Sequence, residues 1–224
     1  MKALILKISF FEAFFKVHYT KGFRLSYPVP LPTSAAGIFG AFLGIDRERL
    51  REEFEGMFFG AKLLRYRGIA SENATFLQYK AKGTEKGVTQ ISLINEPTYL
   101  IAMAGEGKRL EKAMEKIRNS VSFLPYGGQN DFFVKDWEIV GIEDVEESNI
   151  ISNYAPQDLV ENPILEEGSE IQILPVMHRI SKNPNFYFVM NGMLKLKNRL
   201  IVTKKDKIGL YNISKFKPDQ NKYF

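Results

Sequence analysis

The sequence has 224 residues and a mass of 25.7 kDa, which suits one large domain or two small ones. It has no cysteine and only 2 histidines, which excludes disulfide scaffolds, cysteine nucleophiles, cysteine-rich metal sites and polyhistidine metal cages. No secretory signal or bilayer-length apolar run is visible, so we expect a cytoplasmic protein without membrane contact.

The net charge of +5 is unevenly distributed. Residues 1–90 carry 14 Lys/Arg and 8 Asp/Glu, residues 91–170 carry 6 and 16, and residues 171–224 carry 11 and 2. A field of one sign attracts polyanions, so the basic ends suggest nucleic acid, whereas the acidic middle suits a protein partner or a solvated face. The alternative is that the lysine-rich ends only keep the protein soluble.

Hydrophobic periodicity divides the first 145 residues into strands and helices. In chain order, the expected elements are a strand over 4–10, helices over 35–43 and 46–56, strands over 57–67, 74–80, 88–94 and 97–104, a helix over 108–120 and a strand over 132–141. Without the insertions, this order fits a β-α-β-β-α-β ferredoxin-like unit, the architecture of the RRM domain that binds RNA.

The remaining sequence is predicted to be rich in β-structure. Residues 146–168 are acidic and contain several Asn, Pro and Gly residues, which predicts a loop. Strands are expected over 171–179, 185–190 and 193–203, with a hairpin turn at Asn191-Gly192. The fold class is therefore expected to be α+β, with a ferredoxin-like domain over 1–148, a hairpin thumb near 76–92 and a β-rich subdomain over 149–224.

The most informative motif is the segment 27–44, Tyr-Pro-Val-Pro-Leu-Pro-Thr-Ser-Ala-Ala-Gly-Ile-Phe-Gly-Ala-Phe-Leu-Gly. Its prolines enforce an extended entry, and Thr33 or Ser34 is the expected N-cap of the helix that follows. The N–H groups of a helix start favour a phosphate, and Gly37, Gly40 and Gly44 leave a smooth strip for a second backbone. Close packing of this strip on the protein's own sheet is the alternative. The segment lacks both nucleotide-binding glycine motifs, so no cofactor is expected.

This motif resembles the CRISPR-associated "Cas five" family, part of the RAMP superfamily of ferredoxin-like RNA-binding proteins. That family opens with a strand and an aromatic-basic segment, here 13–16, and continues with a Tyr-Pro-x-Pro-x-Pro-Ser/Thr segment and a Gly-x-x-Gly helix, here 27–44. Its later proline-glycine loop is similar to 124–130. The resemblance is close over about the first 45 residues and extends in element order to about residue 145.

The resemblance implies a non-catalytic RNA-binding subunit of a type I Cascade complex, an antiviral defence assembly, that binds the 5′ handle of the crRNA. The implied partners are the crRNA, the Cascade backbone subunit and the large subunit; contacts with the helicase-nuclease and target DNA are left open. No metal is implied. The implied RNA-binding residues are Lys16, Arg24, Tyr27, Ser34, Gly37, Lys80, Lys82, Lys86, Tyr126, Gly127, Gly128, Gln129 and Asn130.

Each of these residues also has a structural interpretation. Lys16 and Arg24 could be ordinary surface charges, and the three hairpin lysines could be a solvated tip. Tyr126 could be a plain turn residue, and Phe14, Phe15 and Phe23 are expected in the core or an interface. A protein-interaction module of the same fold, without RNA, is therefore a further alternative.

One branch of the family cuts precursor RNA without a metal, using tyrosine, lysine and histidine. Such cleavage needs a base for the 2′-hydroxyl and an acid for the leaving oxygen. The candidates here are His18 with Tyr19 and Lys21, and His178 with Arg179. Because that branch pairs lysine directly with histidine and this sequence does not, a metal-independent endoribonuclease is kept as the alternative function.

Overall fold

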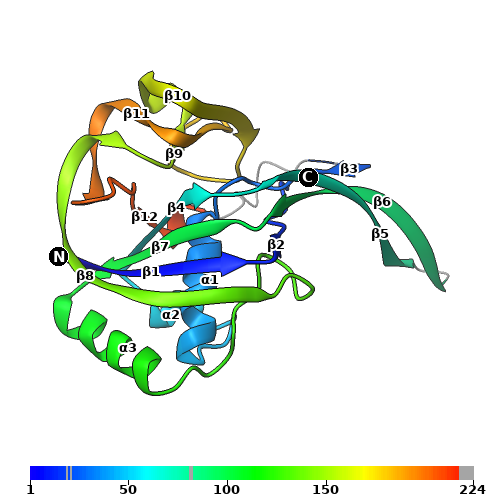
Figure 1. Cartoon of the computed structure of the whole chain (residues 1–224), viewed down its shortest axis with the longest axis horizontal. Coiled ribbons are helices and arrows are strands. Elements are labelled where there is room, and N and C mark those ends of the chain that lie inside the picture. The colour runs from blue at the N-terminus through cyan, green and yellow to red at the C-terminus, as the bar shows by residue number, and fades with distance from the viewer. Residues whose placement is uncertain (19, 21, 81–82, 217–224) are drawn as a thin grey trace.

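The computed structural model describes residues 1–18, 20, 22–80 and 83–216, with the backbone alone for 78–80. Tyr19, Lys21 and Lys82 lie outside the described residues. Figure 1 shows a mixed α+β protein with few helices. Its main elements are β1 (Lys2–Phe10), β2 (Glu12–Ala13), β3 (Phe23–Arg24), α1 (Pro32–Leu43), α2 (Leu50–Glu53), β4 (Phe58–Arg65), β5 (Gly68–Lys80), β6 (Gly83–Asn95), β7 (Thr98–Gly105), α3 (Gly107–Asn119), β8 (Val134–Ile151), β9 (Tyr154–Pro156), β10 (Val160–Pro175), β11 (Asn185–Thr203) and β12 (Tyr211–Asn212).

The large sheet is antiparallel and runs in the order β10-β11-β8-β1-β7-β4-β12, with β9 paired to β11. The strand predicted over 4–10 is present as β1, in which Leu4 and Leu6 join the core beneath the helices whereas Ala3 and Ile5 lie in a second cluster. A strand alternates its side chains between two faces. Apolar residues at successive positions are thus buried because both faces of β1 are covered.

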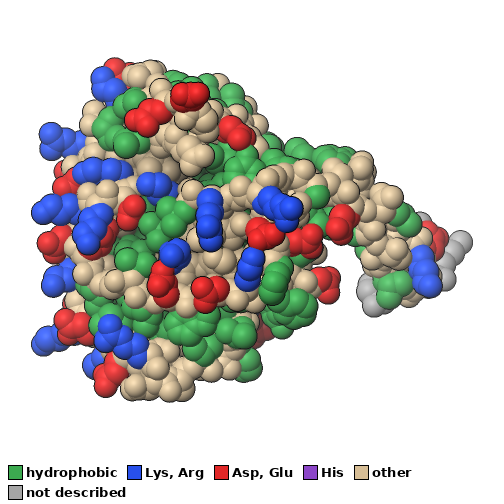
Figure 2. All heavy atoms as spheres, viewed as in Figure 1, with side chains coloured by type: hydrophobic (Ala, Val, Ile, Leu, Met, Phe, Trp, Pro, Cys, Tyr) green, Lys and Arg blue, Asp and Glu red, His purple; other side chains and the backbone are tan. Residues whose placement is uncertain are grey.

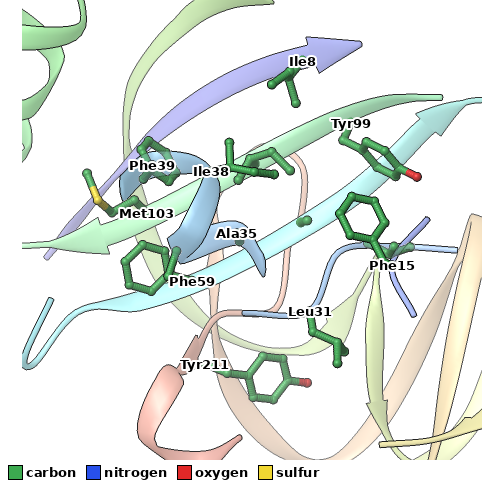
Figure 3. Packing of buried hydrophobic residues seen from close by; sticks show 14 of the residues in the cluster. Ile8, Phe15, Leu31, Ala35, Ile38, Phe39, Phe59, Tyr99, Met103 and Tyr211 are labelled. Carbon is green, nitrogen blue, oxygen red and sulfur yellow. The ribbon is translucent and has the colours of Figure 1, made fainter. Parts of the chain in front are cut away.

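Helices α1 and α3 lie on one face of this sheet, and α1 supplies the main packing surface (Figure 1). Phe39 of α1 faces Phe59 of β4, with ring centroids 6.2 Å apart (Figure 3). Burying such a side chain contributes about 1.5–3 kcal/mol. The helix starts earlier than predicted: Leu31 is its N-cap, without a side-chain hydrogen bond, because Pro32 already has the fixed φ and missing donor that suit a first helical position.

The predicted hairpin is present and longer than expected. β5 and β6 pair from Gly68↔Asn95 to Lys80↔Gly83, so the arm spans 68–95 rather than 76–92. The short strand β3 lies parallel to β6 at the base of the arm, and β2 also pairs with β6. Figure 1 shows the arm projecting beyond the main sheet.

Two predictions for the C-terminal half are wrong. The acidic stretch 146–168 is not a loop, since it contains the end of β8, all of β9 and much of β10. Charged residues are tolerated there because most side chains of these strands remain partly exposed. Asn191-Gly192 is not a turn either: β11 is continuous, and Asn191, with φ of 53°, sits at a bulge where the register with β10 shifts.

The acidic and basic blocks of the sequence meet in space. β11, from the basic block, lies between β8 and β10, which carry 10 of the 16 Asp and Glu residues of the acidic block 91–170. Lys195 pairs with Glu161 at 3.0 Å, and Lys207 pairs with Glu146. Exposed pairs contribute about 0–1 kcal/mol each. On the visible face, Lys and Arg side chains are interleaved with Asp and Glu (Figure 2), which weakens the argument from charge blocks for a polyanion surface at the C-terminus.

One aromatic cluster joins the proline segment to the C-terminal strands. The Tyr27 ring stacks on Phe188, with centroids 5.4 Å apart, and Phe188 also contacts Tyr154 at 5.4 Å. The Tyr154 hydroxyl donates to the Pro30 carbonyl at 3.2 Å. The expected boundary near residue 148 falls inside β8, so residues on both sides of it share strands and a core. No helix in the described part is long and apolar enough to span a bilayer.

Candidate nucleic-acid interface

A groove lies between α1 and the segment 122–134. Its volume is about 1050 Å³, and both walls contain residues that the sequence analysis selected. One wall includes Ser34 and Gly37, and the other includes Tyr126, Gly128 and Asn130. Residues about 90 positions apart are therefore brought together as the resemblance implied.

The three glycines of the α1 motif differ in their surroundings. A Cβ on Gly37 would meet no atom within 4 Å, so this position opens on the groove. Gly40 is covered, because its Cβ would lie 2.4 Å from Leu50. Gly44 ends the helix in the left-handed conformation, with φ of 66°, where glycine avoids the usual Cβ penalty. The smooth strip predicted for a second backbone therefore reduces to Gly37.

The glycines of the facing loop are required by packing within the protein. A Cβ on Gly128 would lie 2.0 Å from the Phe14 carbonyl oxygen, and one on Gly127 would lie 2.8 Å from that of Glu12. The Phe14 N–H donates to the Gly127 carbonyl at 2.7 Å, which fixes the loop against the segment after β2. These two glycines therefore allow the close approach of the protein's own backbone.

Aromatic side chains that the sequence analysis did not select surround the groove. Phe133 is 60% exposed and lies edge-on to Tyr126, with ring centroids 5.9 Å apart. Phe123 and Leu124 are also exposed. Exposed aromatic rings can stack with unpaired bases. The signal available in the sequence was the placement of these apolar residues in a loop flanked by glycine and proline.

Charge in the groove is sparse, since Arg47 and Asp46 are the charged residues that line it. The predicted cations whose side chains the structure describes, Lys16, Arg24 and Lys86, lie elsewhere. Lys16 is exposed, and its backbone forms an isolated antiparallel β-bridge with Ser26. The Arg24 guanidinium lies over the Phe76 ring of the hairpin, 4.8 Å from its centroid, and Lys86 is exposed on β6. The structure therefore does not bring Lys16, Arg24 or Lys86 to the groove with Ser34 and Gly37.

Three further residues implied by the resemblance do not line the groove. Tyr27 is only 2% exposed, and its hydroxyl donates to the Pro175 carbonyl at 2.6 Å. This corrects the expectation that its ring contacts RNA, because the ring is part of the core. Gln129 and Gly127 belong to the facing loop but are not among the residues that line the groove. Phe14 and Phe15 are buried, which confirms the expectation for them, whereas Phe23 is 39% exposed and is not part of the core.

The two histidines are in different surroundings. Nδ1 of His178 accepts from the Ile180 N–H at 3.1 Å, and Nε2 lies 2.8 Å from the Asn183 carbonyl, to which it donates. The ring packs edge-on against Phe186, and burial lowers the pKa of His178. His18 is exposed beside Tyr27; partial desolvation and then the Lys16 charge lower the pKa of His18.

No group of His, Asp and Glu residues in the described part of the chain is arranged to hold a metal ion. The residues that surround the groove instead offer aromatic rings, hydroxyls, a side-chain amide and backbone. Such a lining suits a ligand with flat rings and hydrogen-bonding edges.

Comparisons with known proteins give structural neighbours. No protein-family model matches the sequence, and no curated protein matches it either. A chain of a structure described as "CRISPR RNA-guided surveillance complex" aligns over 87% of this chain and 91% of its own length, at 15% identity and a TM-score of 0.49. The description places this neighbour in a CRISPR complex.

The descriptions of two further structural neighbours name Cas or Cmr proteins. The chain is similar to one described as "Crystal structure of Cas protein", with 14% identity, 88% and 95% coverage and a TM-score of 0.40. It is also similar to a chain of "Cryo-EM structure of the Type III-B Cmr-beta bound to cognate target RNA and AMPPnP, state 1", with 13% identity, 87% and 86% coverage and a TM-score of 0.36.

The lowered pKa of His178 makes stability depend on pH in a definite direction. The folded protein holds this histidine neutral below its ordinary pKa of 6.5, whereas the unfolded chain takes up the proton. Stability is therefore lost as pH falls below about 6.5. We expect the decrease in unfolding free energy between about pH 7.5 and about pH 5 to be smaller in His178→Gln. Urea titrations at both pH values measure this, and an equal decrease in the two proteins would contradict the assignment.

Proposed function

We propose that the protein is a non-catalytic RNA-binding subunit of a type I Cascade complex, and that the groove between α1 and the 122–134 segment receives the 5′ handle of the crRNA. The observation that carries the proposal is the convergence of Ser34 and Gly37 with Tyr126, Gly128 and Asn130 in that groove. The family motif that contains the first pair supplies the identity of the ligand.

We infer further that the core of the fold is ferredoxin-like. Four strands of the large sheet support this, because β8-β1-β7-β4 is a run of antiparallel neighbours. α1 connects β1 to β4, and α3 connects β7 to β8, so the chain order is β-α-β-β-α-β once the hairpin is set aside. This order is the one that RNA-binding domains of the RRM type use.

The groove is suited to bases more than to phosphates. Tyr126 and Phe133 expose ring faces or edges, on which an unpaired base can stack. Asn130 supplies both a donor and an acceptor for a base edge, and Gly37 leaves room for the strand beside the helix. With one Arg and one Asp in the lining, phosphate neutralisation must come from the rim.

The hairpin arm and the acidic strands are the proposed contacts with the backbone and large subunits. Ile69, Leu77 and Val88 on the arm are 52%, 53% and 70% exposed. Apolar side chains on a projecting two-stranded arm are typical of surfaces covered in an assembly. The arm would therefore serve as the thumb that the resemblance implies.

A non-catalytic role is the better of the two candidate functions. Both ring nitrogens of His178 are engaged with backbone groups, which leaves neither for the acid or base that RNA cleavage requires. His18 is exposed and stays the candidate base for the alternative, a metal-independent endoribonuclease. Cleavage of repeat RNA in EDTA that is abolished in His18→Ala would favour that alternative.

The groove proposal predicts the effect of removing the Tyr126 ring. Tyr126→Ala should weaken binding of a labelled single-stranded repeat RNA about 5- to 150-fold, because stacking contributes about 1–3 kcal/mol per base. Tyr126→Phe, which keeps the ring, should bind as the wild type does. Fluorescence anisotropy in EDTA measures affinity, and circular dichroism checks the fold.

Two results would contradict the proposal. One is a wild-type protein, alone or with its backbone subunit, that does not bind the repeat RNA. The other is a folded Tyr126→Ala variant whose affinity equals that of Tyr126→Phe, since the ring would then have no contact with the RNA.

A further inference from the structure

A second cavity lies at the root of the hairpin, where β4 continues into β5 and where β7 and β8 begin. Figure 1 shows the hairpin leaving the main sheet. The cavity has a volume of about 340 Å³, and three cationic side chains surround it: Arg65, Arg67 and Lys135. None of them belongs to the basic residues selected from the sequence. They come from separate parts of the chain, and the fold places them around one opening.

Glu96 organises two of these cations. One oxygen of its carboxylate lies 2.7 Å from Lys135 Nζ, and the other lies 3.2 Å from an Arg67 guanidinium nitrogen. Hydrogen bonds from Lys135 and Arg67 hold the pKa of Glu96 below its ordinary value. The Arg65 Nε donates to Thr98 Oγ1 at 3.3 Å, which directs the third cation to the same opening.

The charged side chains that line this cavity have a net positive charge. Arg65, Arg67 and Lys135 face two carboxylates, Glu96 and Asp136, so the net formal charge of these groups is +1. One Asp136 oxygen already accepts from the Trp137 N–H at 2.9 Å. The ion pairs of Glu96 are largely solvent-exposed, with the Arg67 side chain 79% exposed, and such pairs are weak enough for another anion to exchange with them.

An exposed aromatic ring connects this cavity with the groove. The Phe11 ring is 56% exposed, and the Lys135 ammonium lies 5.8 Å from its centroid. The Phe11 N–H donates to the Phe133 carbonyl at 3.2 Å, and the Phe11 carbonyl accepts from the Glu96 N–H at 2.9 Å. Backbone hydrogen bonds thus place Phe11 between Phe133, which lines the groove, and Glu96, which lines the cavity.

We propose that this cavity is a phosphate site for the RNA strand that occupies the groove, with Phe11 as the stacking surface between the two. The proposal rests on the proposed function of the groove and adds a second contact point outside it. Arg65, Arg67 and Lys135 bind the phosphate, and Glu96 holds two of the cations in place until the phosphate takes its position.

Two features favour a nucleic-acid phosphate over a carboxylate of an acidic protein segment. Aromatic rings combined with cations are the pattern by which proteins bind single-stranded nucleic acid, and here the Phe11 ring lies next to the Lys135 ammonium. Arginine forks also bind phosphate oxygens in pairs. An acidic peptide would use the cations but would leave the exposed ring of Phe11 without a partner.

The salt dependence of RNA binding tests the proposal. For single strands, the slope of log K against log salt falls by about 0.7 for each phosphate that the protein no longer neutralises. We expect Arg65→Ala with Lys135→Ala to weaken binding of the labelled repeat RNA several-fold and to reduce the slope by about 0.7 or more. Lys108→Ala, an exposed cation of α3, is the matched control and should change neither quantity.

Glu96→Gln separates a phosphate site from a structural ion pair. Removing this carboxylate frees two cations for the RNA, so we expect tighter binding and a steeper slope. Unchanged or weaker binding by Glu96→Gln, together with an unchanged slope in the double variant, would overturn the proposal. If Tyr126→Ala still weakens binding in that case, the groove stands and only the second site fails; if the wild type does not bind RNA, both fail.

Discussion

Replacing Gly128 by alanine is expected to destabilise the protein by about 2–6 kcal/mol, the sum of about 1–3 for a strained backbone and about 1–3 for overpacking. Gly128 has φ of 103°, and its Cβ would lie 2.0 Å from the Phe14 carbonyl oxygen. Backbone atoms of two segments would have to separate, and the loop that forms one wall of the groove would move with them. Urea unfolding followed by circular dichroism gives the change.

Two other glycines serve as controls that separate backbone strain from overpacking. Gly168 has φ of 79° but open space around it, so Gly168→Ala should show only the strain. Gly37 lies within α1 with open space, so Gly37→Ala should raise stability by up to about 1 kcal/mol. Equal effects at Gly128 and Gly168 would mean that contact with Phe14 contributes nothing.

Gly37→Ala also has a functional readout. If RNA passes close to α1, the added methyl group should weaken RNA binding in a protein that has become more stable. Opposite signs of the two effects are difficult to explain by misfolding. Unchanged affinity would place the strand away from this helix and toward the aromatic wall.

The elements that sequence predicted well are those with strong local patterns. The strand β1, the helix α3 and the hairpin each depend on residues within one segment. The acidic parts of β8 and β10 were misjudged because their side chains are partly exposed and charged, so they lack an apolar alternation. The strand β11 was divided in two because Asn191-Gly192 is a local turn signal. The acidic strands are held in the sheet by their pairing with a basic one, which is a long-range effect.

The candidate site also contains residues that could be predicted from the sequence and residues that could not. Ser34, Gly37 and the loop from Tyr126 to Asn130 were available from the motif and the resemblance. Tyr27 was misassigned because a tyrosine next to proline gives no local indication that its ring will be buried under Phe188. The cations around the second cavity could not be predicted, since their proximity depends on how the hairpin leaves the sheet.

Phe188→Ala is expected to lower the unfolding free energy by about 3–5 kcal/mol, the usual range for a buried phenylalanine. Phe188 is fully buried between Tyr27 and Tyr154. Its ring therefore holds the proline segment, which leads into α1, against the C-terminal strands. Removing the ring should weaken both ends of the chain at once.

The single tryptophan allows this coupling to be measured. Trp137 lies in β8 against Phe42 of α1, with ring centroids 4.9 Å apart, away from the substituted residue in sequence. In one cooperative unit, Trp137 fluorescence and far-ultraviolet circular dichroism should shift together in Phe188→Ala. Leu77→Ala, at an exposed position of the arm, should shift neither by more than about 0.5 kcal/mol. If the Trp137 transition of Phe188→Ala stays at its wild-type midpoint, the core around Tyr27 does not couple the two parts of the chain. Residues before and after about 148 would then unfold as separate domains.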